Sequence, residues 1–487
     1  MTTSPTDSTK PTASNVLRSG ALNTHHLVFF VVSAAAPLTT IAGFVALAFI
    51  LGGEAAPAGY LIAGVVYALF AVGFTAMSRY VQNTGAFSAF ISKGLGKTLG
   101  AGSAMVAYVG YAAGEIGFCA AAGLFASTAL ENLAGIDVHW GVCAVVIGIG
   151  VGVISYCKVN IGARVLALLL IAEVALLVLL SAAILIEGTP EGLSLAGFNP
   201  STFTASSMGS LFIITFLVYV GFEQTAVYSE EAKNPTRTVP RATYIAVALL
   251  TVIYAGAGWV LLMAIGPNAL ADTLASGDPS ALVFNINEQY LGTALTDVMQ
   301  ILLVTSFIAG VLALHNAASR YLFSLGRDGL LPAFFGRTST TNNSPATAVI
   351  FQACLLVIAV AAFGFSSLDP YTQVVVWMNT PTIVGVLILQ ILTSIAVIRF
   401  FAIHRDRAST WHRLIAPGLA AVALVGVLYL VCTKMSLLTG LSTAGNILIN
   451  LPLVVAFVIG VLRARHLARI DPEAYLKIGQ AEKAGAL

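Results

Sequence analysis

The sequence predicts an all-α membrane protein with twelve transmembrane helices. Three observations support this fold class: long apolar segments, a scarcity of charge, and basic residues that gather on one side of the predicted membrane. Of the 487 residues, 58% are hydrophobic and 9% are charged, and the mean hydropathy is +0.92. This composition excludes a water-soluble domain. Because a spanning helix needs about 20 apolar residues, twelve such segments would use most of the chain.

The predicted spans follow one another without an intervening polar domain. In chain order they cover residues 27–51, 57–82, 99–128, 139–157, 160–186, 207–229, 239–265, 293–322, 346–364, 373–400, 414–433 and 444–462. The segment 83–90 is too short to span and is expected to be re-entrant or surface-bound. Residues 266–291 are expected to form an outer loop with short helical pieces.

The domain organisation follows from these spans. We expect a disordered cytoplasmic tail over residues 1–24, a ten-helix core over 25–405, helices 11 and 12 within 406–466, and a cytoplasmic tail over 467–487. No signal-peptide pattern precedes the first span. The sequence does not indicate an oligomeric state.

The basic residues predict the orientation. All of the 23 Lys and Arg except Lys434 fall in the termini or in the even-numbered gaps between spans. Cytoplasmic loops carry the excess of Lys and Arg, so both termini are predicted to be cytoplasmic in a multi-pass protein of the plasma (inner) membrane. The net charge of +2 is spread thinly and gives no indication of nucleic-acid binding. The five cysteines form no metal-ligand pattern, and no cofactor is expected.

Two spans contain segments that are apolar but poorly suited to a helix. In the segment 33–43, Pro37 has no N–H to donate, so the carbonyl of Ser33 is expected to lose its helical partner. Thr39 and Thr40 follow, in the middle of the first span. Pro and Gly also produce simple kinks in membrane helices, so this segment alone does not decide the architecture.

The second irregular segment lies in the sixth span. There Gly221 precedes an acid and an amide, Glu223 and Gln224, inside the apolar segment. Interrupted helices in corresponding places, five helices apart, are typical of inverted-repeat transporters, which direct the freed backbone groups toward a solute.

Motifs around the sixth and eighth spans resemble those of the amino acid–polyamine–organocation (APC) permease family. They are Gly221-Phe222-Glu223, Ser229-Glu230-Glu231-Ala232-Lys233-Asn234-Pro235, Val239-Pro240-Arg241-Ala242, Asn316-Ala317-Ala318-Ser319-Arg320, Gly326-Arg327-Asp328-Gly329-Leu330-Leu331-Pro332 and, more loosely, Gly85-Ala86-Phe87 with Gly94-Leu95-Gly96. The resemblance implies a 5+5 inverted-repeat, LeuT-like fold with discontinuous helices 1 and 6. It also implies secondary active transport of amino acids or related amines, often coupled to protons.

The chain departs from the family in two places. Helix 1 of many relatives has a Gly-Ser-Gly-like break, where this chain has the residues 37–40, Pro-Leu-Thr-Thr. An aromatic gate of some relatives would fall at Leu217 and is therefore absent or displaced to Phe216 or Tyr219.

The candidate substrate contacts follow from the chemistry of an amino acid. Its carboxylate needs free N–H groups at a half-helix N-terminus, for which we expect the backbone from Leu38 to Gly43. Its ammonium needs carbonyls, expected within 34–36 and 216–220. The predicted substrate-binding residues are Ala36, Leu38, Thr39, Thr40, Ala42, Gly43, Tyr111, Phe216, Tyr219 and Val220.

Three acids lie within predicted spans: Glu115, Glu173 and Glu223. Intramembrane carboxylates are costly and mark either function or pairing inside the bundle. Glu223, at the helix-6 break, is the candidate for proton-linked gating. Glu173 occupies a place where a proton-coupled relative carries a Lys, so it is a candidate for proton, cation or cationic-substrate binding. Glu115, which shares a helical face with Tyr108 and Tyr111, is a further candidate for coupling or gating.

Several alternatives remain open from the sequence. Thr305 and Ser306, together with Glu173, are candidate Na⁺ ligands, although membrane Ser and Thr more often bond helix carbonyls. His315 is a candidate titrating group or a packing residue. An exchanger of related amines is the rival within transport. A membrane-embedded enzyme is not favoured, because no nucleophile–base pair or metal-ligand spacing is present. The three acids lean toward amine or cationic substrates, but proton coupling would need them as well.

Overall fold

The computed structural model describes residues 23–81, 85–157, 163–227, 232–338 and 345–479. The predicted disordered N-terminal tail, together with Glu230 and Glu231, lies outside the described residues, apart from the last two residues of that tail. Within the described ranges the regular elements are helices, which confirms the all-α class.

The α-helices are α1 (Thr24–Ala35), α2 (Val45–Gly52), α3 (Ala56–Ser78), α4 (Phe87–Leu95), α5 (Lys97–Ala134), α6 (Trp140–Cys157), α7 (Ala163–Glu187), α8 (Ala205–Leu217), α9 (Gln224–Val227), α10 (Pro235–Ile265), α11 (Leu270–Ser276), α12 (Leu282–Leu291), α13 (Thr293–Arg327), α14 (Ala346–Gly364), α15 (Val376–Ile403), α16 (Ala416–Thr439), α17 (Thr443–Ile470) and α18 (Pro472–Lys477). Three π-helical turns, η1 (Thr39–Phe44), η6 (Pro370–Val375) and η8 (Trp411–Ile415), each precede a longer helix. The 3₁₀ turns are η2 (Gly53–Ala55), η3 (Ala196–Phe198), η4 (Pro200–Thr202), η5 (Pro279–Ala281) and η7 (Arg405–Arg407).

By length and composition, ten helical segments in the described part of the chain are able to cross a membrane. The first of them, Thr39–Ser78, joins η1, α2, η2 and α3. Two shorter apolar helices, Thr24–Ser33 and Ser207–Leu217, accompany the ten.

Local sequence signals set several helix ends. Thr204 and Ser207 form a capping box at the start of α8, so two backbone N–H groups there find side-chain partners. Ser442 caps α17 by accepting from the Gly445 N–H. At the end of α5, Gly135 adopts a φ of +67°, a left-handed conformation that glycine enters without steric cost.

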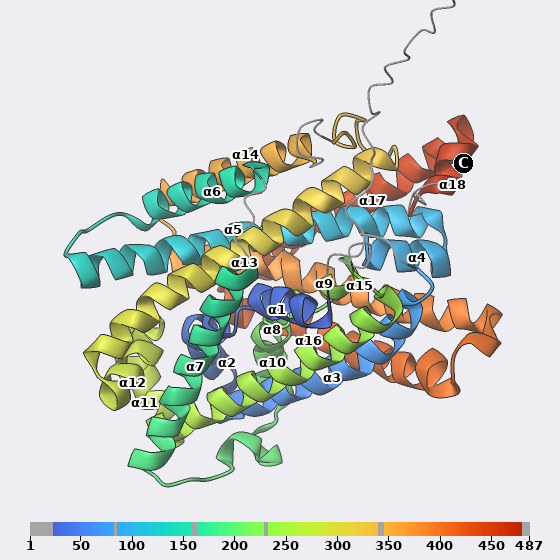
Figure 1. Cartoon of the computed structure of the whole chain (residues 1–487). Helices are drawn as coiled ribbons and strands as arrows, with labels where there is room; N and C mark the ends of the chain where they lie inside the picture. Colours follow the sequence, from blue (N-terminus) through green and yellow to red (C-terminus); the bar gives the residue numbers. More distant parts are fainter. Residues whose placement is uncertain (1–22, 82–84, 158–162, 228–231, 339–344, 480–487) are drawn as a thin grey trace, which may run out of the picture.

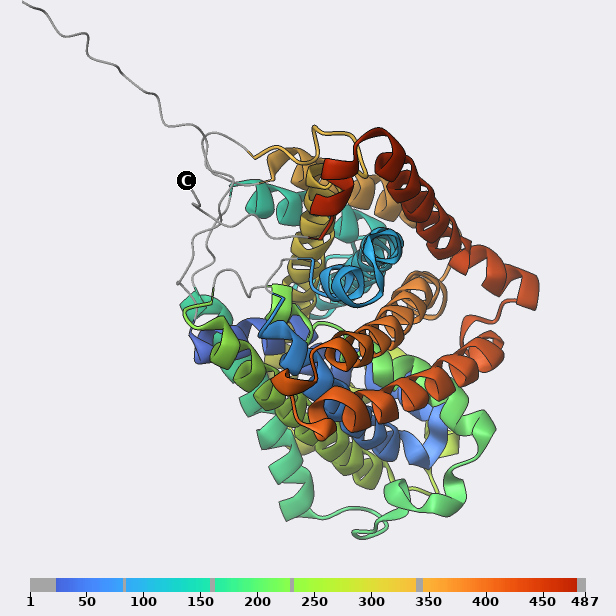
Figure 2. The same cartoon turned by 90° about the vertical axis from the view of Figure 1, so that its right-hand side faces the viewer.

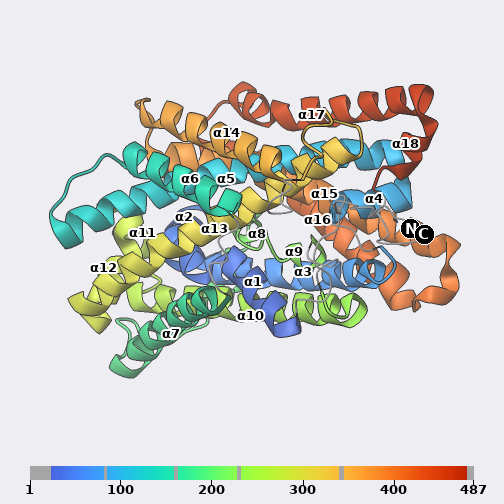
Figure 3. The same cartoon turned by 45° about the horizontal axis from the view of Figure 1, so that its top comes forward.

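The long helices lie side by side in one bundle. α5 packs against α13, and α3 packs against α10, as both views show (Figures 1 and 3). α6 and α14 run together along one edge of the molecule (Figure 1). α17, drawn in red, lies at the outer margin in Figure 2, and most of its side chains remain exposed.

Short helices mark the two ends of the bundle. α11 and α12 lie at one end, where the sequence predicts short helical pieces, and α4 and α18 lie at the other (Figure 1). The predicted non-spanning segment 83–90 leads into α4, whose first six residues are buried. α17 continues to Ile470, so helix replaces the first residues of the tail predicted from 467.

Candidate substrate-binding site

The first predicted irregular segment is a helix interruption. α1 ends at Ala35, and the buried Ala36 adopts a φ of +45°, a left-handed conformation that is rare for a residue with a Cβ. The chain then turns through the π-helical residues Thr39–Phe44 before α2 begins. π-helical turns in membrane helices often occur at functional sites.

One detail of this interruption differs from the sequence prediction. The Ser33 carbonyl does not lose its partner to Pro37, because the Ala36 N–H lies 3.2 Å from it and 3.0 Å from the Val32 carbonyl. The last turn of α1 tightens and shares one donor between two acceptors. The interruption therefore begins at Ala36 and not at Ser33.

The second predicted irregular segment is also interrupted. α8 ends at Leu217, and α9 begins at Gln224. Between them the backbone runs through tight turns, such as Val220 N–H to the Leu217 carbonyl at 2.9 Å. Gly221 has a φ of +121°, which favours glycine at this position.

Two tyrosines bond the backbone carbonyls of the interruptions. The Tyr254 hydroxyl, on α10, lies 2.9 Å from the Ala35 carbonyl and 3.3 Å from the Val218 carbonyl, so it joins the two breaks. Tyr67, on α3, donates to the Phe216 carbonyl at 3.1 Å. The two hydroxyls thus take the place of the backbone N–H donors that a continuous helix would supply. The carbonyls they bond lie in the segments expected to bind the substrate ammonium.

A small buried cavity lies between the two breaks, with a volume of about 20 Å³. Its lining combines backbone-break residues with side chains from α5, α13 and α15. The lining residues are Ala35, Thr40, Phe44, Phe118, Leu217, Val218, Val220, Gln224, Leu314, Asn379 and Thr382.

Of the ten residues predicted to bind substrate, some line this cavity and others do not. Thr40 and Val220 line the cavity. Ala36, Leu38, Thr39, Ala42 and Gly43 lie at the first break and are buried, but are not among the lining residues. Phe216 lies at the end of α8, with its ring 5.2 Å from that of Tyr67. The hydroxyls of Tyr219 and Tyr111 are bonded elsewhere, Tyr219 to the Tyr60 carbonyl at 3.0 Å and Tyr111 to Glu223.

Sequence reasoning missed several lining residues, including the amides Gln224 and Asn379. Both are polar residues inside apolar segments, and that signal was sufficient to find them. Phe118 and Leu314 carried no such signal, because an apolar residue in an apolar span does not reveal which neighbour it faces.

The Glu223 carboxylate lies at the second break and is fully buried. Its Oε1 accepts a hydrogen bond from the Tyr111 hydroxyl at 2.5 Å, and its Oε2 accepts from the Gly221 N–H at 3.0 Å. The carboxylate thus accepts from the Gly221 N–H, a backbone donor that the interruption leaves without a helical partner, and also from Tyr111 on α5.

The Glu173 carboxylate, on α7, reaches the other side of the first break. The Ser306 hydroxyl donates to its Oε2 at 2.9 Å, and the Leu38 backbone N–H lies near this carboxylate. The adjacent Thr305 instead donates to the Leu302 carbonyl of its own helix at 2.9 Å. Of the two candidate Na⁺ ligands, Ser306 therefore meets Glu173.

Glu115 belongs to a buried network that joins α5, α13 and α14. His315 Nδ1 lies 2.6 Å from its Oε1, and Gln352 Nε2 donates to its Oε2 at 2.7 Å. Tyr108 donates to Gln352 Oε1 at 3.1 Å. The predicted polar face of Tyr108, Tyr111 and Glu115 thus faces partners inside the bundle.

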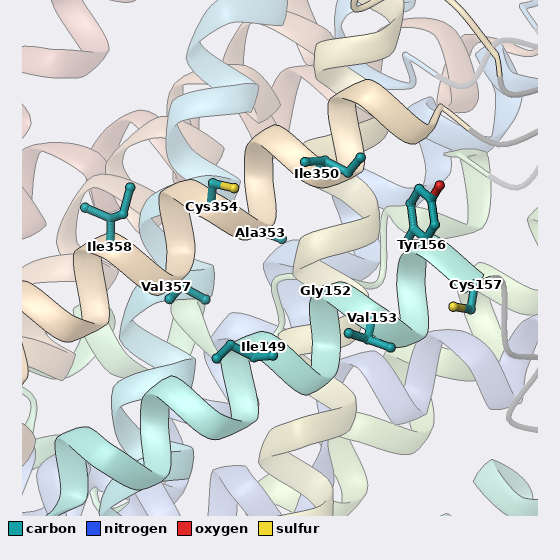
Figure 4. A pocket seen from close by; sticks show the side chains of 10 residues that line it. All are labelled: Ile149, Gly152, Val153, Tyr156, Cys157, Ile350, Ala353, Cys354, Val357 and Ile358. Atoms are coloured by element: carbon teal, nitrogen blue, oxygen red, sulfur yellow. The ribbon is translucent and has the colours of Figure 1, made fainter.

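A larger hollow of about 690 Å³ lies between α6 and α14 (Figure 4). Ile149 and Val153 on one helix and Val357 and Ile358 on the other line it with apolar side chains. No charged side chain lines it, and its polar groups are limited to the Tyr156 hydroxyl and the thiols of Cys157 and Cys354, so we do not assign the site to it.

The ten apolar helical segments of the described residues that are long enough to cross a membrane are typical of a multi-pass helical membrane protein. A model of the amino acid permease family matches residues 22–462 of the chain. The chain therefore belongs to this family, within the APC superfamily, as its motifs indicated. Because family members are permeases, the prediction that the chain is not an enzyme is confirmed.

Several curated proteins align with part of the chain. The branched-chain amino acid permease BcaP of Lactococcus lactis subsp. cremoris is 30% identical over 153 residues, 31% of each chain. The amino acid permease YecA of Bacillus subtilis is 25% identical over 34% of this chain and 37% of its own. The methylthioribose transporter of Bacillus subtilis is 32% identical over 27% of each chain. These three alignments span between 27% and 37% of the relatives' own length.

Proposed function

We propose that the chain is a secondary active transporter that moves amino acids or related small amines across the plasma membrane. The observation that carries this proposal is the buried cavity between two interrupted helices, where Tyr254 bonds a carbonyl of each break. Unpaired backbone at membrane depth is stable only where protein or a cavity covers it, and transporters use it to hold solute. Family membership and the permease relatives support the same function.

The architecture proposed for this function has twelve spans in a 5+5 inverted repeat. If α1 with α2 forms span 1 and α8 with α9 forms span 6, the two breaks fall five spans apart. The ten-helix core then covers residues 25–405, and α16 and α17 lie outside it. These helix bounds support the count made from the sequence.

The proposed orientation places both termini in the cytoplasm. Lys97, at the start of α5, bonds the Ile478 carbonyl after α18, and Arg463 donates to the Leu330 carbonyl after α13. Basic segments distant in sequence therefore meet at one end of the bundle, which supports a common cytoplasmic side.

The proposed transport cycle requires the cavity to open. A volume of about 20 Å³ holds about one water molecule, whereas pockets for small-molecule ligands measure roughly 300–1,000 Å³. We therefore assign the arrangement to a closed conformation. Substrate entry then requires α1 or α9 to move away from the cavity, with Tyr254 releasing a carbonyl.

Proton coupling is the favoured mode of energy input. Glu223 bonds the backbone of the second break, so protonating its carboxylate would remove an acceptor from either Tyr111 or the Gly221 N–H. Glu173 lies beside the first break, near the Leu38 N–H, and accepts a hydrogen bond from Ser306. The alternatives are Na⁺ coupling at Glu173, Ser306 and Thr305, and obligatory exchange.

Uptake into proteoliposomes tests the proposal. The purified chain should accumulate labelled amino acid inside empty vesicles when the outside is acidic, and should do so without Na⁺. Accumulation that follows a Na⁺ gradient would favour the sodium alternative, and uptake only into preloaded vesicles would favour exchange. Thr40→Trp should abolish uptake, whereas Thr433→Trp, an exposed threonine on α16, should leave it unchanged. Absence of uptake for every amino acid and amine tested would refute the transporter proposal.

A further inference from the structure

We propose that the cavity selects an amino acid with an uncharged, apolar side chain, and that the amides of Gln224 and Asn379 bind its polar ends. The inference rests on the proposed transport function and narrows its substrate class. It follows from two properties of the lining: unpartnered amide atoms and the absence of ionisable side chains.

Each of the two amides has a buried atom without a hydrogen-bond partner. Gln224, at the start of α9, has no hydrogen-bond partner for Nε2, and Asn379, on α15, has none for Oδ1, among the described residues. Both side chains are only 3% exposed, and both line the cavity. An unpartnered buried amide atom is unfavourable, so these two positions are prepared for a polar ligand.

The orientation of the Asn379 amide is set by its neighbour on the same helix. Its Nδ2 donates to the Val375 carbonyl at 2.8 Å, which a carbonyl oxygen could not do. Oδ1 therefore remains as an acceptor. No hydrogen bond within the described residues fixes the Gln224 side-chain amide, so its Nε2 can turn toward a ligand as a donor.

A donor on α9 and an acceptor on α15 match the two ends of an amino acid. Gln224 Nε2 donates to the substrate carboxylate, and Asn379 Oδ1 accepts from its ammonium. Thr382 adds no free donor, because its hydroxyl already donates to the Gly110 carbonyl at 2.9 Å. The carbonyls of Ala35 and Val218, bonded by Tyr254, become further ammonium acceptors when that hydroxyl moves.

The rest of the lining favours an apolar side chain. Phe44 and Phe118 lie with their ring centroids 5.8 Å apart, and Leu217, Val220 and Leu314 complete the apolar surface. A branched or unbranched aliphatic chain would displace little ordered solvent there and gain the burial of its apolar area.

A cationic side chain would have no partner in the cavity. None of the residues that line it is ionisable. Glu223 is held by Tyr111 and the Gly221 N–H, and Glu115 is held by His315 and Gln352. An unpaired buried charge is strongly unfavourable, so lysine, arginine and polyamines are excluded. The proposal therefore differs from the lean toward cationic substrates that the three acids suggested in the sequence.

Binding to the purified full-length protein tests the proposal. The displacement of labelled leucine is measured with valine, lysine, arginine, putrescine, isoamylamine and 4-methylpentanoate; the last two lack the carboxylate or the ammonium of leucine. We expect valine to compete, and the other five to compete at least tenfold more weakly. Lysine or arginine competing as well as valine would overturn the inference and leave transport intact. Failure of every amino acid and amine tested to bind would refute the proposed function itself.

Variants test the two amides separately. Gln224→Met and Asn379→Leu should each weaken leucine binding about tenfold or more, which corresponds to about 1.4 kcal/mol. Gln390→Met removes another fully buried amide of α15 that does not line the cavity, so it should leave leucine binding within about twofold. Asn379→Asp places a carboxylate in the lining and should increase lysine binding relative to leucine. Parent-like leucine affinity in both amide variants would overturn the assigned roles. If a variant does not fold, the displacement series on the unaltered protein still tests the substrate class.

Discussion

The Tyr254 hydroxyl donates to the Ala35 carbonyl at 2.9 Å, at the residue where α1 ends. The same oxygen lies 3.3 Å from the Val218 carbonyl, just after α8 ends. One side chain on an uninterrupted helix therefore bonds both interrupted ones. This arrangement makes the two breaks dependent on each other, because movement of either changes the partner of the other.

Removing this hydroxyl should weaken both the fold and transport. In Tyr254→Phe the Ala35 and Val218 carbonyls lose a buried donor, which costs about 1–3 kcal/mol of stability. We expect a lower thermal midpoint for the purified protein and slower uptake. Tyr80→Phe is the matched control, because the Tyr80 hydroxyl bonds the Arg407 carbonyl at 3.0 Å at an exposed site. Identical melting and uptake for Tyr254→Phe and the parent protein would show that the bridge has no role.

Neutralising Glu223 should separate coupling from substrate movement. In Glu223→Gln the amide presents one acceptor where the carboxylate presents two, so either the Tyr111 hydroxyl or the Gly221 N–H loses its partner. We expect accumulation driven by a pH gradient to fall by at least tenfold, while exchange between preloaded vesicles and medium persists. Glu288→Gln, an exposed acid on α12, should change neither rate. Gradient-driven accumulation that survives Glu223→Gln would remove this acid from the coupling mechanism.

The sequence predicted both helix interruptions for physical reasons that are local. Pro37 lacks a donor, and Gly221 precedes an acid within an apolar span, so neither stretch suits a regular helix. The left-handed conformation of Ala36 was not predictable, because alanine has no preference for it. The surrounding packing imposes that conformation.

The partners of the buried acids were not predictable from the sequence. Glu115 and His315 are 200 positions apart, and their contact depends on how α5 packs against α13. The same holds for Glu173 with Ser306, although both had been singled out. Hydropathy identifies which polar residues are inside the bundle, but it does not specify which polar residue on another helix each one meets.

The Glu115–His315 pair should show a strong non-additive effect on stability. Removing Glu115 leaves His315 buried without this partner, and removing His315 leaves Glu115 with Gln352 alone, at a cost of roughly 3–5 kcal/mol. We therefore expect Glu115→Leu and His315→Leu each to lower the thermal midpoint sharply. The double variant should lose clearly less than the sum of the two.

A neutral pair between the same helices provides the comparison. Asn132 Nδ2 donates to Gln300 Oε1 at 3.1 Å, and this pair is only partly buried. The cycle of Asn132→Leu and Gln300→Leu should show smaller single effects and little coupling. Equal coupling energies in the two cycles would mean that the Glu115–His315 contact has no special role in the fold.

The docking of the C-terminal segment onto the end of the bundle that carries α4 should depend on pH. The Gly479 N–H donates to Asp328 Oδ2 at 3.1 Å, and Ile478 is only 2% exposed. Burial raises the pKa of Asp328 to about 6 from its usual 3.8, although the Gly479 N–H and the cations of Arg327 and Lys97 act in the opposite direction. The raised pKa means that the docked state binds more protons than the undocked state between about pH 4 and pH 6.

The sign of the effect follows from this difference. Docking is strongest when Asp328 is protonated, and it weakens as the pH rises through 6, by up to roughly 3 kcal/mol if undocking returns the carboxylate to water. We expect backbone hydrogen exchange in residues 472–479, corrected for its intrinsic pH dependence, to be slower at pH 5 than at pH 7.5. In Asp328→Asn, residues 472–479 should be protected equally at both pH values. In Glu473→Gln, which changes an exposed acid on α18, the difference in protection between the two pH values should remain. Equal protection of the unaltered protein at both pH values would show that Asp328 does not control docking. A pH dependence of protection that persists in Asp328→Asn would assign this control to another group.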